Sequence, residues 1–160
     1  MSCLWYFRLI ISFCLSGYVL CQCRAGWKYH AGMCFYFSDE KKSWYEAAVN
    51  CRTHRSSLVV VNTHDINTFV VNQINRHGGS YWTDGTDDFQ EGEWEWPSSG
   101  QLFNFTNWYH GQPDNHHSQG EDCLAIHAQH SSTWFDDQCS LKQKYVCYES
   151  SIQDGGFVIG

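Results

Sequence analysis

From Ser43 to Cys51, apolar side chains recur at the i, i+3, i+4, i+7 spacing that is typical of one face of an α-helix. They are Trp44, Ala47, Ala48 and Cys51. Ser38 or Asp39 is able to cap the start, because a short polar side chain accepts a hydrogen bond from a free N–H of the first turn. The pattern predicts a first helix with one buried face.

A second helix is predicted by the same spacing further along the chain. Its apolar positions are Ile66, Phe69, Val70 and Ile74. Asn62 or Thr63 is placed to cap its start, and the two glycines of 77–79 favour an end there, since glycine accepts the left-handed backbone that closes many helices. Between the two helices, the apolar run 58–61 predicts a short buried strand.

The chain after Gly79 consists of short aromatic and β-branched runs separated by Gly, Pro, Asn and Asp. This pattern predicts strands that are connected by loops. The runs are 94–96, 103–108, 123–127 and 145–148. Two helices followed by several short strands indicate an α+β fold.

The stretch 109–121 is polar, contains Pro113 and has neither helical nor strand periodicity. It predicts a long loop that something other than a hydrophobic core must hold in place. Because long ordered loops often carry binding residues, this loop is the first candidate for a functional site.

The amino-terminal residues resemble a secretory signal peptide. Arg8 is the only charge in residues 1–21, and the apolar run 9–15 is far shorter than the roughly 20 residues that span a bilayer. Cleavage is expected before Gln22, with a cut after Gly17 or an uncut signal anchor as the alternatives. The predicted organisation is a signal peptide at 1–21, one domain at 22–149 and a flexible tail at 150–160.

The cysteine count agrees with cleavage before Gln22. The chain has 9 cysteines, and loss of Cys3, Cys14 and Cys21 leaves an even six. Six cysteines in an oxidising compartment make three disulfides, for which parity and spacing alone allow about 15 pairings. A zinc site is the other use of clustered cysteines, and the lack of a Cys-x-x-Cys pair argues against it.

Charge and motif content exclude several classes of function. The formal net charge at pH 7 is −7, and loss of Arg8 makes it −8, which argues against nucleic acid or an anionic membrane as the main partner. Cations and neutral ligands suit this charge better. Catalysis is not expected, because the chain has no nucleophile elbow, metal-hydrolase helix or phosphate-binding loop.

A series of motifs extends over about residues 23–148. They are Cys23-x-x-Gly26-Trp27, Cys34-Phe35-Tyr36-Phe37, Trp44 through Cys51, Glu91-Gly92-x-Trp94-x-Trp96, Thr106-Asn107-Trp108, Gly111-Gln112-Pro113-Asp114, Glu121-Asp122-Cys123 and Trp134-x-Asp136-x-x-Cys139 ahead of Val146-Cys147. Together they resemble the long form of the C-type lectin-like domain, and the most similar subgroup is that of secreted single-domain lectins of invertebrates, such as perlucin-like proteins. The resemblance implies two helices that flank small antiparallel sheets, with a long calcium-binding loop.

The resemblance also implies a disulfide pattern and one local departure. The implied pairs are Cys23–Cys34, Cys51–Cys147 and Cys123–Cys139. The pair that closes nearly the whole domain would contribute on the order of 4 to 5 kcal/mol in the chain-entropy model. The family usually has a Trp-Ile-Gly-Leu type strand where this chain reads Trp82-Thr83-Asp84-Gly85, so a locally altered strand is expected.

Gln112, Asp114, Glu121 and Asp136 match the family positions that bind calcium at the sugar site. Calcium prefers six to eight oxygen ligands, which carboxylates and amides supply. In the family the peptide before Pro113 is cis, and two vicinal sugar hydroxyls complete the calcium shell. A Gln-Pro-Asp sequence alone would indicate only a polar turn, but the acids at the other expected positions favour a calcium-dependent sugar site.

A second set of residues matches the auxiliary calcium site of the family, which braces the long loop. The matching residues are Asp87, Glu91, Asn115, Glu121 and Asp122. The resemblance implies a mainly structural ion here. A solvated acidic surface is the alternative, because acids are common in this chain.

The order of amide and acid in Gln112-Pro113-Asp114 resembles galactose-type members, which implies galactose or N-acetylgalactosamine as the ligand. Phe135 stands where sugar-binding relatives have an asparagine that binds both calcium and sugar, so we expect weak binding and a gain in affinity for Phe135→Asn. His116 stands where galactose-type relatives often have a tryptophan that stacks on the sugar. It either stacks more weakly or is, with His117, a solvated loop residue.

The predicted function is that of a secreted calcium-dependent lectin that recognises microbial or self glycans. Useful avidity for glycans needs several copies, so a homo-oligomer is a possible assembly. The alternative is a calcium-braced domain that binds protein or mineral in an extracellular matrix without binding sugar, and Phe135 favours it. Asn104 begins an Asn-x-Thr sequon and is a candidate glycosylation site.

Overall fold

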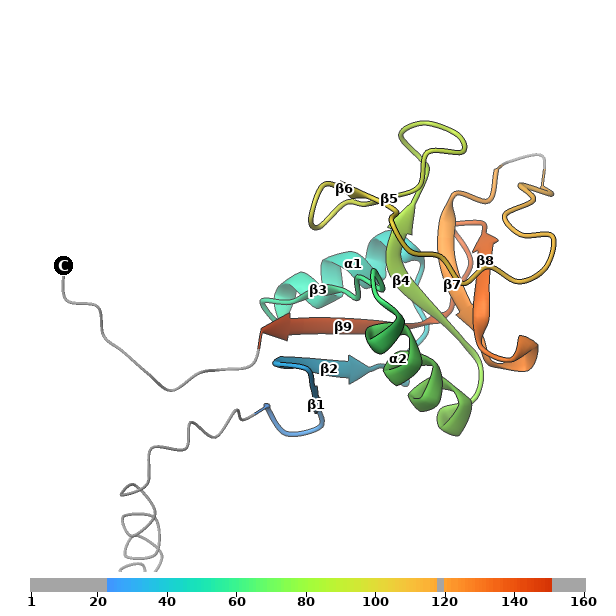
Figure 1. Ribbon diagram of the computed structural model, residues 1–160. Helices are drawn as coiled ribbons and strands as arrows, with labels where there is room; N and C mark the ends of the chain where they lie inside the picture. Colours follow the sequence, from blue (N-terminus) through green and yellow to red (C-terminus); the bar gives the residue numbers. More distant parts are fainter. Residues whose placement is uncertain (1–22, 118–119, 151–160) are drawn as a thin grey trace, which may run out of the picture.

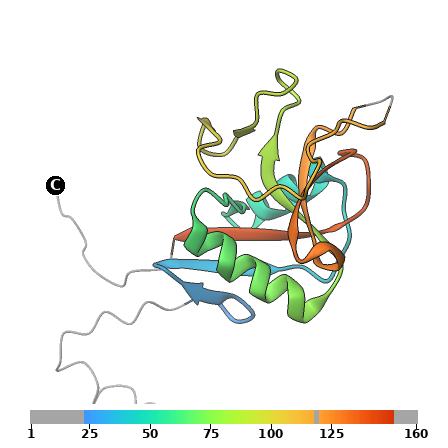
Figure 2. The same ribbon diagram turned by 45° about the vertical axis from the view of Figure 1, so that its right-hand side comes forward.

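The computed structural model describes residues 23–117 and 120–150. The predicted signal peptide lies outside these residues, as does the predicted tail apart from Ser150, so both stay predictions. Figures 1 and 2 show two helices packed around a mixed sheet, with several long connections gathered at one end. This arrangement is the α+β architecture expected from the sequence.

The first part of the sheet brings the two ends of the described chain together. β1 (Lys28–His30) and β2 (Met33–Phe37) form an antiparallel hairpin. β9 (Lys144–Ser150) pairs antiparallel with β2 and with the short β3 (Ser57–Leu58). The carboxyl-terminal strand is therefore central, and it carries Cys147 into the interior (Figure 1).

The second part of the sheet carries the long connections. β4 (Ser80–Thr86) pairs in parallel with β9 and antiparallel with β7 (Cys123–His127), which in turn pairs with β8 (Thr133–Asp137). The short β5 (Glu95–Trp96) pairs with the end of β4 and with β6 (Gln101–Leu102). The connection from Trp108 to β7 contains the predicted loop 109–121, which has no helix or strand among its described residues.

Both predicted helices are present, and one predicted cap is wrong. α1 (Trp44–Thr53) begins after Ser43, whose side chain accepts from the N–H of Glu46 while the Glu46 side chain accepts from the N–H of Ser43. This capping box excludes Ser38 as the cap, because the Ser38 hydroxyl instead accepts from the N–H of Tyr145 on β9. Ser38 thus links the segment before α1 to β9.

The second helix agrees with its predicted limits. α2 (His64–His77) is capped by the hydroxyl of Thr63, which accepts from the N–H of Ile66, and it ends at Gly78 with a backbone φ of +65°. A positive φ is tolerated by glycine at little cost. The side chains on the inner face of α2, Ile66, Val70 and Ile74, are buried.

Two predicted strands differ from the structure. The run 58–61 is a strand only at Leu58, although the three valines that follow are buried and Val59 is bonded to both Val146 and Asp84 through backbone groups. The run 103–108 is not a regular strand; β6 precedes it, and only Trp108 bridges to Trp134. In both cases the aromatic or branched side chains are there because they are buried. The backbone does not pair with a neighbouring strand along the whole run.

The core consists of two clusters of buried side chains, and two of the three disulfides lie in the smaller one. Trp96 and Trp134 lie fully buried in the larger cluster, and Trp82 is fully buried in the smaller one. The disulfide pattern implied by the resemblance is present: Cys23–Cys34, Cys51–Cys147 and Cys123–Cys139. The last of these fixes the start of β7 to the segment after β8, and therefore holds the two strands next to the long loop.

The altered strand at 82–85 is confirmed. The register between β4 and β7 shifts between Trp82 and Thr86, which indicates an irregularity in the ladder. A Cβ atom on Gly85 would lie 2.7 Å from the ring of Phe103 and 2.9 Å from Leu124, so only glycine fits there. Asp84, which stands at the glycine position of the family pattern, is buried and accepts a hydrogen bond from the N–H of Ser98 at 2.9 Å.

Candidate calcium site

Three carboxylates, two from the loop 109–121 and one from β8, lie together at the loop end of the sheet. Asp114 comes from the long loop, Glu121 from the approach to β7, and Asp136 from β8. One carboxyl oxygen of each lies within 4.8 Å of the others. We call these three residues the primary cluster. All three were predicted as calcium ligands from the sequence.

Backbone N–H groups of the long loop hold two of these carboxylates. Asp136 Oδ2 accepts from the N–H of Asp114 at 2.9 Å and from the N–H of Asn115 at 2.7 Å. Glu121 Oε2 accepts from the N–H of His116 at 2.8 Å. The loop is therefore wrapped around acidic side chains instead of an apolar core, which explains why its sequence has no hydrophobic periodicity.

Two buried oxygen atoms near the primary cluster have no hydrogen-bond partner. They are Oδ1 of Asp136 and Oε1 of Gln112, whose peptide bond to Pro113 is cis. Buried polar atoms in folded proteins almost always have a partner, so these two acceptors are available to bind a cation. The predicted ligand atoms are carboxylate and amide oxygens, which is the ligand set that calcium prefers. The residues fit the ion that the family implies.

Burial changes the acidity of the primary cluster. The pKa values of Glu121 and Asp136 are raised, mainly because burial disfavours the charged form. Each also lies near a negative neighbour, Asp136 for Glu121 and Asp114 for Asp136, which raises the pKa further. A divalent cation would remove both causes, since it supplies opposite charge where water is excluded.

The residues predicted for an auxiliary calcium site are arranged differently. We call Asp87, Glu91 and Asp122 the auxiliary group. Asp87 Oδ2 accepts from the N–H of Gly92 at 2.9 Å, and Glu91 Oε2 accepts from Asn115 Nδ2 at 2.7 Å. Among the described residues these three acids do not form a carboxylate cluster like the primary one. A calcium ion at this position stays a prediction.

Asn115 connects the two acidic regions. Its Oδ1 accepts from the N–H of Glu121 at 2.9 Å while its Nδ2 donates to Glu91. Burial raises the pKa of Asp87 to about 6, and Asp87 Oδ1 is buried without a partner. This single unpartnered oxygen is the feature of the auxiliary group that favours a cation.

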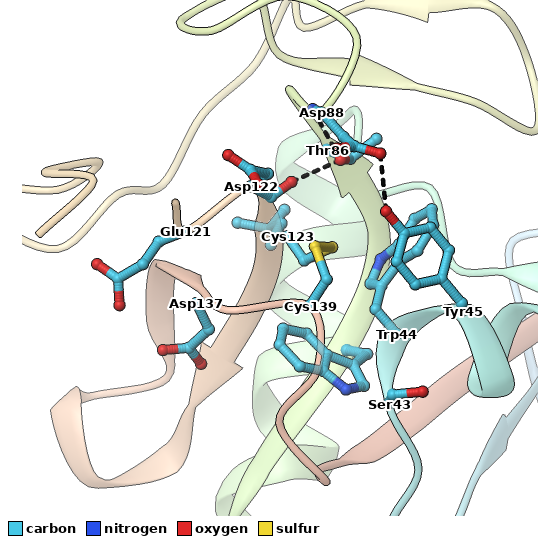
Figure 3. The surroundings of a disulfide bond; sticks show 12 residues. Ser43, Trp44, Tyr45, Thr86, Asp88, Glu121, Asp122, Cys123, Asp137 and Cys139 are labelled. Carbon is cyan, nitrogen blue, oxygen red and sulfur yellow. Dashed lines mark hydrogen bonds between the residues drawn. A yellow bond between two sulfur atoms is a disulfide. The ribbon is translucent and has the colours of Figure 1, made fainter. Parts of the chain in front are cut away.

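Figure 3 shows Asp122 next to Glu121, a member of the primary cluster. Glu121 and Asp122 are neighbours at the start of β7, and their side chains point in different directions. The carbonyl of Asp122 accepts from the hydroxyl of Thr86 at 2.5 Å, beside Asp88, which accepts from the hydroxyl of Tyr45 at 2.7 Å. Asp122 is therefore part of a contact between β4, β7 and α1.

Phe135 lies on the opposite face of β8 from Asp136. Its ring stacks on Tyr109 at a centroid distance of 5.1 Å and on His127 at 4.5 Å. The sequence drew attention to Phe135 only as a missing calcium ligand, and it gave no indication of this aromatic contact. The spacing of Tyr109 and His127 along the chain has no periodic signal that could have revealed it.

Two other predicted residues are exposed. His116 lies in the loop with its ring 5.6 Å from that of His117, and His117 Nε2 is 3.5 Å from Glu121 Oε1. Asn104 is exposed on a bend after β6, in a position that a glycan could reach. A sugar contact by His116 and glycosylation of Asn104 both stay predictions.

Comparison with known proteins identifies the family. Residues 40–149 match the model of the lectin C-type domain. A perlucin-like protein of Mytilus galloprovincialis is 33% identical over 130 residues, which are 79% of this chain and 82% of the relative. A hepatic lectin of Gallus gallus is 34% identical over 122 residues, 76% of this chain but only 56% of the relative. The chain belongs to the C-type lectin domain family.

Solved structures agree with this assignment. The human scavenger receptor C-type lectin carbohydrate-recognition domain superposes with a TM-score of 0.75 at 32% identity, covering 81% of this chain and 99% of that domain. None of these comparisons indicates an enzymatic family, and carbohydrate binding is the activity they make plausible. Within residues 23–117 and 120–150, no helix has the length and apolar character that crossing a membrane requires.

Proposed function

We propose that this protein is a calcium-dependent lectin whose ligand is bound at the primary cluster together with Gln112. The observation that carries the proposal is the convergence of three carboxylates, one of which, Asp136, has a buried oxygen that lacks a partner. Calcium would supply charge neutralisation and open coordination positions for two sugar hydroxyls. Gln112, Asp114, Glu121 and Asp136 would each bind the ion through side-chain oxygen.

The proposed ligand is of the galactose or N-acetylgalactosamine type. The amide at position 112 and the acid at position 114 set which side of the ion offers an N–H donor and which offers only acceptors. A pair of vicinal hydroxyls is selected by this arrangement. Recognition of microbial or self glycans in a defence role would follow from such a specificity.

The proposed location is extracellular. Three disulfides in a domain of this size suit an oxidising compartment, and the apolar segment at 1–21 is the proposed secretion signal. A monomeric glycan site binds weakly, so we propose that avidity comes from a homo-oligomer.

A glycan array tests this proposal. The mature domain is applied with calcium and again with a chelator, beside a Glu121→Gln variant as a matched control for the ligand set. Calcium-dependent binding to terminal galactose or N-acetylgalactosamine, lost in the variant, is the expected result. Equal binding with and without calcium would contradict the proposed site.

A second function is favoured by Phe135, which stands where an asparagine is expected to bind both ion and sugar. In this alternative, calcium braces the loop and the domain binds protein or mineral in an extracellular matrix. No glycan binding under either condition, together with a lower melting temperature in chelator, would select this alternative.

A further inference from the structure

The outward face of α1 borders an open groove. Tyr45 and Val49, which are 51% and 56% exposed, supply apolar surface along it. The other residues that line it are polar or charged: Lys41, Lys42, Glu46, Asn50, Thr53 and Lys142. Three lysines and one carboxylate give the lining a net charge of +2, although the whole chain has a net charge of −7. We call this surface the α1 groove.

The lysines of the α1 groove are available to a partner. Glu46 pairs with Lys142, and Glu40, which is outside the groove, lies 3.1 Å from Lys42. Both carboxylates are exposed, and ion pairs at the surface contribute little to stability. A carboxylate from a partner can therefore join or replace these pairs at little cost.

The loop between β4 and β5 carries the complementary combination of an exposed ring and negative charge. Phe89 is 88% exposed, which makes it the most exposed large apolar side chain of the described residues. Residues 87–93 also contain four acids and no lysine or arginine. An aromatic ring among carboxylates suits a surface that has both apolar groups and lysines. We call residues 87–93 the Phe89 loop.

Hydrogen bonds within the Phe89 loop fix its shape. Asp87 accepts from the N–H of Gly92 at 2.9 Å through its side chain and from the N–H of Gln90 at 3.0 Å through its carbonyl. The carbonyl of Gln90 accepts from the N–H of Glu93 at 2.9 Å. Because the loop is already ordered, burial of the Phe89 ring in a partner costs less conformational entropy than burial of a free segment.

The Phe89 loop and the α1 groove lie side by side in one molecule. The hydroxyl of Tyr45, which lines the groove, donates to Asp88 Oδ2 at 2.7 Å (Figure 3). Asp88 directly precedes Phe89. An isologous interface uses the same surface on both copies. A two-fold axis beside this contact would therefore place the Phe89 loop of each copy against the α1 groove of the other.

We propose that two copies of this chain form a two-fold dimer in which each Phe89 ring packs on Tyr45 and Val49 of the other copy. The carboxylates of the Phe89 loop then face the lysines of the α1 groove. A second copy is the occupant because every copy carries both complementary surfaces. This inference names the contact surface of the proposed homo-oligomer, and it rests on the proposed function for its role in avidity.

The proposed sugar site stays open in this dimer. The Glu121 side chain points away from Tyr45 and Asp88 (Figure 3). The dimer contact is therefore on a different side of the start of β7 from the primary cluster. Two open sugar sites on one dimer raise the avidity for a surface that displays many glycans.

Analytical ultracentrifugation of the mature protein, without any glycan, tests the proposal. The wild type should convert from monomer to dimer across the micromolar range. Phe89→Ala should weaken the dimer by about 100-fold or more, because two buried rings are lost from each dimer. Since no sugar is present, the result does not depend on whether the calcium site binds glycans.

Two further variants separate the proposed contact from a general effect. Val49→Asp places a negative charge in the α1 groove, opposite the acidic loop, and should weaken the dimer as Phe89→Ala does. Tyr29→Ala removes a side chain that is 51% exposed on β1, outside both surfaces, and should leave the dimer unchanged. Thermal melts in calcium should show all three variants folded, because each replaced side chain is exposed.

A mixture of the Phe89→Ala and Val49→Asp proteins tests the two-fold exchange. The first protein keeps an intact groove and the second keeps an intact ring, so a mixed dimer retains one of its two contacts. The mixture should therefore dimerise more readily than either variant alone.

Three outcomes would each overturn the proposal. They are a monomer at every concentration, a dimer that Phe89→Ala leaves unchanged, and assemblies larger than the dimer. Calcium-dependent glycan binding by a protein that stays monomeric would leave the proposed sugar site standing while it overturned this dimer.

Discussion

The primary cluster and the auxiliary group each consist of aspartate and glutamate side chains at the same end of the molecule. Only in the primary cluster do the carboxylates lie close to one another. In the primary cluster, the loop 109–121 and β8 direct carboxylates to one point. In the auxiliary group, the Asp87 carboxylate is bonded to the N–H of Gly92 and the Glu91 carboxylate to Asn115. The three acids do not converge. The difference teaches that acid content alone does not make a candidate metal site, because the carboxylates must also be held close to one another.

Asp136→Asn should have the largest effect, which is a loss of calcium affinity in the primary cluster. A unit charge 4 Å from another is worth roughly 4 kcal/mol at an effective dielectric constant near 20, so loss of one carboxylate should lower calcium affinity by about 100-fold or more. Calorimetric titration with calcium chloride measures it. The matched variant Asp122→Asn, in the auxiliary group, should change the affinity by less than about threefold, since the unit charge it removes lies outside the primary cluster, where solvent screening leaves little interaction. Equal losses in the two variants would contradict the distinction.

Removal of calcium should have the next largest effect, which is a loss of folded-state stability. A ligand present at about 100 times its Kd stabilises the folded state by roughly 2.7 kcal/mol, which a chelator would reverse. The effect should be greatest near pH 7. The stabilisation by calcium should decline as pH falls, because protons compete with the ion for the carboxylates. The decline should begin at a higher pH than for exposed carboxyl groups, because burial raises the pKa of Glu121 and Asp136. Thermal melts at several pH values, with and without chelator, test this; stability gained from calcium at pH 4 would argue against the carboxylate site.

Asp84 sharpens the comparison because it is a buried acid that belongs to neither region. Burial raises its pKa from 3.8 to about 6, so the folded protein binds the proton more tightly than the unfolded chain does. The charged form therefore lowers stability progressively as pH rises from about 4 to about 6. Asp84→Asn should raise the free energy of unfolding by about 2 kcal/mol at pH 7 and leave it unchanged below about pH 4.

Urea denaturation at pH 4 and pH 7 measures the Asp84 effect. The stabilisation should be the same with calcium and with chelator, since Asp84 is not a proposed ligand. Asp136→Asn, by contrast, should stabilise only in chelator, where it removes a buried charge with no cation beside it. An Asp84 effect that depends on calcium would show that burial alone does not explain its pKa.

Phe135→Asn should have the smallest effect, a gain of about three- to tenfold in affinity for methyl β-galactoside. The reason is that the family pattern has an asparagine at this position as a ligand, and a net gain of about 1 kcal/mol, the usual worth of one hydrogen bond, corresponds to about fivefold. The direction of residue 135, on the opposite face of β8 from Asp136, keeps the expected gain small. Calorimetry with this monosaccharide measures the gain. Unchanged glycan binding would count against the placement of β8 within the family pattern.

Much of the fold was determined by the sequence itself. The helical spacing around Trp44 and Ile66 predicted α1 and α2, because burial of one helix face leaves a periodic pattern. The motif series predicted the family and, through it, all three disulfides. The cap at Ser38 and the strand at 103–108 were wrong, because a polar residue before a helix and a run of aromatic residues can each be used in tertiary contacts instead.

The candidate site was also predicted only in part from the sequence. The sequence named Gln112, Asp114, Glu121 and Asp136 through their motifs, since ligands of one family keep their order along the chain. Only the tertiary structure decided that the acids of the primary cluster meet while those of the auxiliary group do not, and that Phe135 stacks on Tyr109 and His127. These outcomes depend on the direction of each side chain and on contacts between segments far apart in the chain, and neither leaves a periodic signal in the order of residues.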